Sequence, residues 1–137
     1  GVICAADYVI ATDRASTKLS EMALGFGPFV IGPVVERRIG AGPFAAMTVD
    51  TDWRDAKWAE RHGMFAQVVT DIDALDDAVN ELTDKLASSN PDAMMRLKNV
   101  FWQGTDHWDD LLADRARMSG ELVLSDFASK AIGAFRK

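Results

Sequence analysis

A succession of helical patterns without strand signals fills the second half of the sequence, and this feature constrains the fold more than any other. After Asp71, apolar residues recur at spacings of three and four: Ile72, Leu75, Val79, Leu82 and Leu86. This spacing places them on one face of an amphipathic helix, with Asp71 as its N-terminal cap. Further helices are predicted from Asn90-Pro91, after Gly104-Thr105 and from Ser125-Asp126. Residues 71–137 are therefore expected to form a helical module.

Strand signals occur only in the first half of the chain. Residues 8–11 have strand character, and residues 64–69 predict a second short strand. Helices are predicted over residues 33–39, 43–49 and 52–62, the first of them between an initial Pro33 and a terminal Gly40. The pattern indicates an α/β class that is mostly α in this segment.

Charge and composition exclude several functions. The net charge of −6 leaves no positive excess to displace counterions from phosphates, so we expect no nucleic-acid partner. No apolar run approaches the ~18 residues of a membrane span, so we expect no membrane partner. The single cysteine, Cys4, excludes an internal disulfide. It fits a reducing compartment or indifference to redox state, and we expect a cytoplasmic protein.

One acidic residue, Glu21, lies in a weakly polar segment punctuated by glycines. It is followed by three apolar residues and then by Gly25, Gly27 and Pro28, which make the backbone turn sharply just after the carboxylate. Such a turn suits a carboxylate at the rim of an apolar pocket with backbone N–H groups nearby. Pattern alone favours a solvated surface carboxylate that leads into a loop.

The order and spacing of these residues resemble a known family. Residues 6–12 read Ala-Asp-Tyr-Val-Ile-Ala-Thr, and Ala15, Glu21, Gly25 and Pro28 follow. This is similar to the enoyl-CoA hydratase/isomerase (crotonase) superfamily, whose members read Cys-Asp-hydrophobic-x-hydrophobic-Ala and then Ala-x-Phe-x-x-x-Glu-x-x-x-Gly-x-x-Pro. Residues 27–33 also resemble the methylglutaconyl-CoA hydratase branch.

The resemblance implies a particular fold and assembly. The chain would be the C-terminal half of a crotonase-like ββα spiral, with residues 1–70 as the last part of the spiral core. Residues 71–137 would be the helical module, which in the family supports trimers or hexamers. Both N–H donors that stabilise the enolate oxygen would then lie upstream of Gly1.

The resemblance also implies the chemistry. Glu21 falls on a catalytic glutamate, and an apolar pocket would let its carboxyl group both accept and donate a proton near neutral pH. The reaction expected is addition of water to a 2-enoyl-CoA, with Gly25, Pro28 and Phe29 binding substrate and the Phe29 N–H holding the water. The family's other catalytic glutamate lies six residues before Asp7, at a position that is Gly1 here.

The C-terminal residues carry a weaker resemblance. Ala134-Phe135 and the basic end match the family's closing segment, whereas Lys130 and Ala131 depart from it. Phe135 is read as a core or interface anchor or as a stacking partner for the CoA adenine. Lys137 is read as a CoA phosphate contact or as a solvated terminus.

Alternative functions stay open because Gly1 cannot transfer a proton. They are enoyl-CoA isomerase, acyl-CoA thioester hydrolase and a non-catalytic assembly unit. We expect no cofactor beyond the CoA of the substrate and no metal, since His107 and its acidic neighbours lack ligand spacing. Cys4 is interpreted as a buried inert thiol, and His62 as a structural residue at the end of a helix. Arg37-Arg38 is interpreted as a solvated helix face. We interpret the aromatic residues Phe101, Trp102 and Trp108 as a subunit contact.

Overall fold

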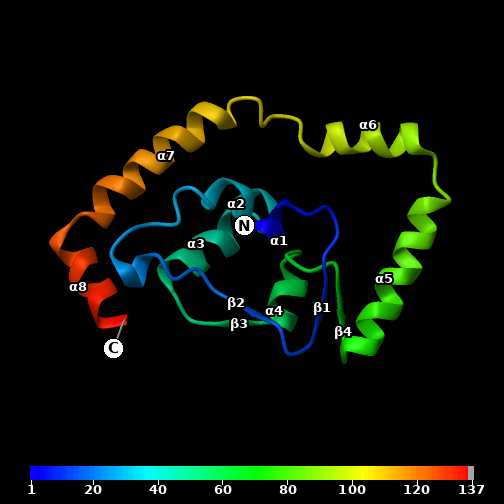
Figure 1. Cartoon of the computed structure of the whole chain (residues 1–137), viewed down its shortest axis with the longest axis horizontal. Helices are drawn as coiled ribbons and strands as arrows, with labels where there is room; N and C mark the ends of the chain where they lie inside the picture. Colours follow the sequence, from blue (N-terminus) through cyan, green and yellow to red (C-terminus); the bar gives the residue numbers. More distant parts are fainter. Residues whose placement is uncertain (136–137) are drawn as a thin grey trace.

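The structure is a computed structural model that describes the backbone of residues 1–135 and the side chains of residues 1–134. Short helices and strands alternate up to residue 69, and long helices follow (Figure 1). In chain order the elements are α1 (Val2–Ala5), β1 (Ile10–Thr12), β2 (Ser16–Thr17), the 3-10 helix η1 (Met22–Leu24), α2 (Gly32–Ile39), α3 (Ala41–Val49), β3 (Arg54–Asp55), α4 (Ala56–Arg61), β4 (Gln67–Val69), α5 (Ile72–Ala87), α6 (Pro91–Phe101), α7 (Trp108–Val123) and α8 (Asp126–Phe135).

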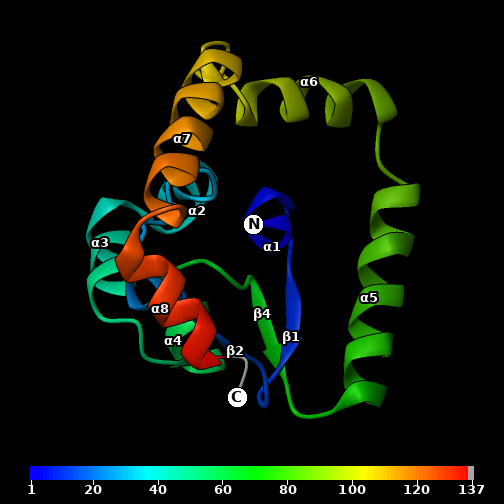
Figure 2. The same ribbon diagram turned by 60° about the vertical axis from the view of Figure 1, so that its left-hand side comes forward.

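Two pairs of short strands organise the first half. β1 and β4 pair in parallel, with Ile10 opposite Gln67 and Thr12 opposite Val69. β2 and β3 pair antiparallel, with Ser16 opposite Asp55. Parallel strands need a long crossover, and here the intervening helices supply it. Figure 2 shows β1 and β4 side by side, with α7 and α8 across the molecule from α5.

The hydrophobic core lies between these strands and the short helices. It is formed by Cys4, Ala11, Leu19, Val35, Ile39, Met47, Ala56, Ala59, Met64 and Phe65. Val35 of α2 and Met47 of α3 are each only 2% exposed. Burial of side chains of this size contributes about 1.5–3 kcal/mol each, so the α2–α3 contact anchors the segment that follows Glu21.

Arg38 corrects the prediction of a solvated Arg37-Arg38 face. Its Nη1 donates to the carbonyl oxygens of Ala6 (3.2 Å) and Asp7 (3.1 Å), and its Nη2 donates to the Met64 carbonyl oxygen (3.4 Å). The guanidinium therefore joins α2 to the end of α1 and to the segment before β4. Of the two arginines, only Arg37 is exposed.

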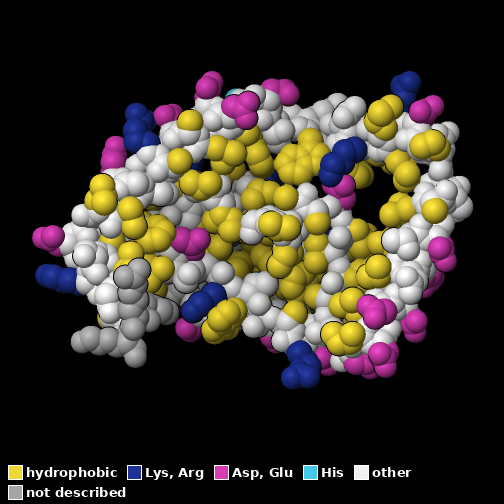
Figure 3. Space-filling view, in the orientation of Figure 1, with side chains coloured by type: hydrophobic (Ala, Val, Ile, Leu, Met, Phe, Trp, Pro, Cys, Tyr) yellow, Lys and Arg dark blue, Asp and Glu magenta, His cyan; other side chains and the backbone are white. Residues whose placement is uncertain are grey.

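The helices from α5 to α8 form an arc around the body of the chain (Figure 1). Asp71 and Asn90 cap α5 and α6 as predicted, since Asp71 accepts from the Ala74 N–H at 2.8 Å and Asn90 from the Asp92 N–H at 2.9 Å. α5 contacts β1, and α8 returns to contact η1. Figure 3 shows hydrophobic side chains gathered along the inward side of this arc.

The expected α/β class, mostly helical in this segment, is confirmed. The helix predicted over 52–62 is wrong at its start, because Arg54 and Asp55 pair with β2 and Asp55 caps α4 through the Trp58 N–H at 2.7 Å. The division into residues 1–70 and 71–137 stays a prediction. Among the described residues, no helix is both long enough and apolar enough to cross a membrane.

Candidate active site

Glu21 sits at the start of η1, where the chain reverses direction. Its carbonyl oxygen accepts hydrogen bonds from the N–H groups of Leu24 (2.9 Å) and Phe26 (3.2 Å). Gly25 ends the 3-10 helix at φ +92°, a left-handed conformation that glycine adopts at least cost. The sharp turn predicted after the carboxylate is thus present, and it holds the Glu21 carbonyl group through the residues that follow it.

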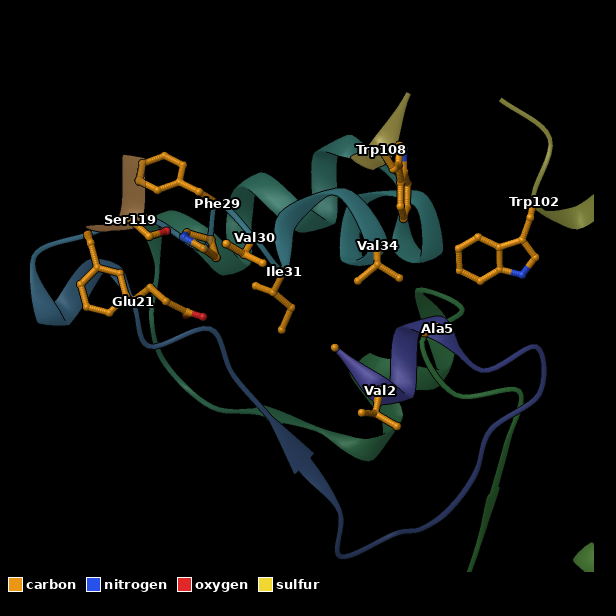
Figure 4. A pocket seen from close by; sticks show the side chains of 14 residues that line it. Val2, Ala5, Glu21, Phe29, Val30, Ile31, Val34, Trp102, Trp108 and Ser119 are labelled. Carbon is orange, nitrogen blue, oxygen red and sulfur yellow. The ribbon is translucent and has the colours of Figure 1, made fainter. Parts of the chain in front are cut away.

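The Glu21 side chain points into a cavity of about 640 Å³ (Figure 4). Helix α1, the 26–31 segment and α2 form most of its wall, and Trp102, Trp108 and Ser119 complete it. Glu21 is the only ionisable side chain among the described side chains that line it. The cavity is therefore an apolar space with one carboxylate at its edge.

The Glu21 carboxylate has a buried oxygen without a hydrogen-bond partner in the structure. The side chain as a whole is half-buried, and its Oε2 atom is the buried one. Leaving a polar atom buried and unpaired is costly, commonly about 1–3 kcal/mol. Such atoms are rare and call for an explanation, of which a catalytic role toward a ligand is one. The Glu21 carboxylate thus has the capacity to accept a proton from a bound molecule.

Pro28 and Phe29 line the cavity together with Glu21, and substrate binding by them stays a prediction. The Phe29 N–H donates to the Gly27 carbonyl oxygen at 2.8 Å, in a three-residue turn centred on Pro28. The N–H that was expected to hold a water molecule is therefore engaged within the chain. The Phe29 ring folds back against Gly27, where a β-carbon would come within 2.7 Å of it.

Gly25 lies against α8 and is not among the residues that line the cavity. A β-carbon on Gly25 would meet Phe127 Cδ1 at 2.5 Å and the Ala128 Cα at 3.3 Å. Its place in the structure is thus a close contact that lets α8 approach the Glu21 turn. Substrate binding by Gly25 stays a prediction.

Two other expected binding residues lie at the end of the chain. The side chain of Phe135 and the whole of Lys137 lie outside the described residues. Their contacts with an acyl-CoA stay predictions. Among the residues that the structure does describe, no three His, Cys, Asp or Glu side chains gather as metal ligands would.

Cys4 and His62 behave as structural residues. Burial raises the pKa of the Cys4 thiol, while the N-terminal ammonium group and Arg38 act in the opposite direction. The thiolate is therefore disfavoured, which does not suit a nucleophile. His62 ends α4, and its Nδ1 lies 2.8 Å from the Trp58 carbonyl oxygen while its ring stacks on the Trp58 indole.

Several lining residues were not singled out from the sequence as site residues. Val34 of α2 and Ser119 of α7 line the cavity, and so do Trp102 and Trp108, which had been interpreted as a subunit contact. They meet because the segment from α6 to α7 lies against α1 and α2, and no local pattern contains that information. Gly1 also lines the cavity, so the position that lacks the second carboxylate shares a wall with Glu21.

Solved structures share this fold along nearly the whole chain. An enoyl-CoA hydratase from Mycobacterium avium matches with 24% identity and a TM-score of 0.88, over 98% of this chain and 53% of its own. A carnitinyl-CoA hydratase from the same organism matches with 22% identity and a TM-score of 0.85, over 98% of this chain and 53% of its own. An enoyl-CoA hydratase/isomerase from Pseudoalteromonas atlantica matches with 17% identity and a TM-score of 0.86, over 97% of this chain and 54% of its own. Comparison with curated protein sequences finds no match.

These likenesses define the class of fold as that of the crotonases, and the chain spans about half the length of the solved structures it matches. The sequence itself matches the family model for enoyl-CoA hydratase/isomerase over residues 1–135. The chain belongs to the enoyl-CoA hydratase/isomerase family. The methylglutaconyl-CoA hydratase branch stays a prediction.

Proposed function

We propose that the protein containing this chain adds water to a 2-enoyl-CoA thioester, with Glu21 as general acid and base. The observation that carries this proposal is the buried, unpaired Oε2 of Glu21 at the edge of an apolar cavity. The apolar wall suits an acyl group, and the carboxylate is placed to act on a proton within that wall. CoA is part of the substrate, and the proposal needs no separate cofactor.

The proton balance of the reaction fits a single carboxylate. Glu21 accepts a proton from water as the water oxygen bonds to the β-carbon and the double-bond electrons move toward the thioester carbonyl. The same carboxyl group then delivers that proton to the α-carbon, so that one water molecule is added and Glu21 returns to its ionised form. Negative charge on the thioester oxygen requires N–H donors, which the family resemblance places upstream of Gly1.

Substitution of Glu21 with glutamine tests the proposal in the full-length protein. Glutamine keeps the size of the side chain and removes proton transfer, a step that contributes about 10²–10⁴-fold to the rate. We expect kcat for hydration, followed by loss of enoyl-thioester absorbance, to fall within that range. Glu121→Gln, on the exposed part of α7, is the matched control and should retain activity. Unchanged activity in Glu21→Gln would remove Glu21 from the mechanism and favour the assembly-unit alternative.

Isomerisation is the second candidate, because one carboxylate can also carry a proton from the γ-carbon to the α-carbon. The absence of any other ionisable side chain among the described residues lining the cavity favours it as much as hydration. Mass spectrometry of the product separates the alternatives. Hydration adds the mass of water, isomerisation leaves the mass unchanged, and thioester hydrolysis releases free CoA.

The proposal also covers assembly and location. The apolar residues exposed on α6 include Met95, Leu97 and Val100, which supports a homotrimer or hexamer built through the helical module. Sedimentation of the full-length protein tests this, and a stable monomer would contradict it. The absence of a second cysteine supports a cytoplasmic location, which fractionation of cells that make the protein would test.

A further inference from the structure

The segment from α6 to α7 meets the first half of the chain through a small number of side chains. Close backbone packing between the arc of helices and residues 1–70 occurs at the two ends of the arc, where α5 contacts β1 and α8 contacts η1. Figure 3 shows an opening between the body of the chain and the part of the arc that α5 and α6 form. The position of Trp102 and Trp108 beside the Glu21 cavity therefore depends on side-chain contacts in the middle of the arc.

One ion pair crosses this contact. Lys98 Nζ of α6 donates to Asp7 Oδ2 at 2.6 Å, although the two residues are 91 positions apart. Among the described side chains, this is the only hydrogen bond that the structure shows between residues 88–124 and residues 1–70. The backbone of Asp7 is itself held, because its carbonyl oxygen accepts from Arg38 of α2 at 3.1 Å. The ion pair therefore joins α6 to a fixed point on the first half of the chain.

Two cations hold the Trp102 ring. The Arg37 guanidinium of α2 lies 4.5 Å from the ring centroid, and the Lys98 ammonium group lies 5.5 Å from it. The indole Nε1 of Trp102 is buried and has no hydrogen-bond partner in the structure, so no hydrogen bond of its own fixes the ring. The ring meets the Trp108 indole edge to face at 5.9 Å, so a displacement of Trp102 also affects the second indole that lines the cavity.

We propose that Lys98, Asp7 and Arg37 are positioning residues that hold the α6–α7 segment beside the Glu21 cavity. This proposal rests on the proposed function, since it takes the cavity as the place where the substrate binds. Asp7 holds Lys98, and Arg37 holds the Trp102 ring. The Lys98 and Asp7 side chains are 51% and 43% exposed, so their attraction is open to screening by salt. Charge thus sets the position of this side of the cavity, and substrate binding should depend on it.

Steady-state kinetics of the full-length protein tests the proposal through the split between KM and kcat. Lys98→Met and Asp7→Asn should each raise KM for a 2-enoyl-CoA by about two- to fivefold, the range of a partly exposed ion pair, and leave kcat unchanged. The double variant should raise KM no more than the larger single change, because both substitutions remove the same contact. Lys98→Arg should restore most of the original KM. Lys85→Met is the matched control, since Lys85 pairs with Glu81 at the same 2.6 Å but within α5.

Tryptophan fluorescence gives a measurement that does not depend on the reaction. Loss of the charged contacts brings the Trp102 indole into contact with water, so the emission of Lys98→Met should move to longer wavelength. Arg37→Met, which removes the other cation and leaves the ion pair intact, should have the same effect. The shift should be largely absent when either substitution is made in a Trp102→Phe background. Added salt should produce it in the unmodified protein, because salt screens partly exposed charges.

The outcomes separate this inference from a purely structural role and from the proposed function. Unchanged KM and emission in Lys98→Met and Asp7→Asn overturn it, even where the free energy of unfolding falls. A lower KM in Asp7→Asn also overturns it, because Lys98 would then attract the anionic CoA directly. If Glu21→Gln abolishes turnover while KM and emission ignore these charges, the positioning role is wrong and the role of Glu21 stands. If both respond as expected while Glu21→Gln stays active, the positioning role stands and the proton-transfer role is wrong.

Discussion

Replacing Gly25 with alanine tests whether α8 holds the turn that carries Glu21. Gly25 combines a φ of +92° with a close approach to α8, where a β-carbon would lie 2.5 Å from Phe127 Cδ1 and 3.3 Å from the Ala128 Cα. The substitution therefore introduces two separate penalties. One is the left-handed backbone conformation, and the other is displacement of α8.

The size of each penalty can be worked out from the structure. A left-handed conformation costs a residue with a β-carbon about 1–2 kcal/mol. The Phe127 ring is 67% exposed and can swing away, whereas the Ala128 backbone, in a residue that is 0% exposed, must shift by a few tenths of an ångström. We expect this contact to add about 1 kcal/mol to the loss of unfolding free energy, which is within the 0.5–3 kcal/mol by which residues in contact affect each other's stability. The total loss of unfolding free energy is then about 2–3 kcal/mol.

Urea unfolding of the full-length protein measures this loss, and Gly104→Ala supplies the control. Gly104 has a φ of +80° with nothing within 4 Å of its β-carbon position, so it carries the backbone penalty alone. In a Phe127→Ala background, Gly25→Ala should lose most of the contact penalty. A Gly25→Ala loss no larger than that of Gly104→Ala would show that α8 does not brace the turn. If α8 does brace it, kcat should also fall in Gly25→Ala and stay unchanged in Gly104→Ala.

Two further predictions concern stability. Hydrogen bonds, first from the Ala74 N–H and then from the Thr70 hydroxyl, hold the pKa of Asp71 below its ordinary value. The stability that the Asp71 carboxylate contributes is therefore present above the unfolded-state pKa, about pH 4, and is lost as the pH falls through the folded-state pKa. Asp71→Asn should make the loss of stability with falling pH less steep. An unchanged dependence of unfolding free energy on pH would contradict this. Arg38→Met should lower the free energy of unfolding by about 2–4 kcal/mol, because it leaves backbone carbonyl groups unpaired. The exposed Arg37→Met should lower it by about 1 kcal/mol or less. Thermal unfolding measures both, and equal losses would contradict the structural role given to the Arg38 hydrogen bonds.

Local signals in the sequence predicted the helices well. The caps at Asp71 and Asn90 and the three-and-four spacing after Asp71 depend only on residues within one or two turns of each other. The structure places α5 at Ile72–Ala87 and α6 at Pro91–Phe101, close to the predicted positions. The strands at Ile10–Thr12 and Gln67–Val69 also fall within or beside their predicted runs.

Long-range pairing accounts for the features that the sequence did not predict. Arg54 and Asp55 had a helical pattern, but their backbone groups pair with β2, which lies far away in the chain. Arg38 carries the charge of a solvated residue, yet it donates to carbonyl groups 26 and more positions away. Such partners are brought together by the packing of α1, α2 and β4, which no window of the sequence contains.

The sequence alone determined the helical second half, the turn after Glu21 and the family resemblance, since each depends on residue types at short, fixed spacings. Only the tertiary structure decided that the Glu21 carboxylate faces an apolar cavity, that α8 packs on the Gly25 turn and that Trp102 and Trp108 line the same cavity. These facts depend on where the arc of helices returns to the body of the chain. That return is set by many weak apolar contacts between distant segments, and their sum is not encoded at any one position.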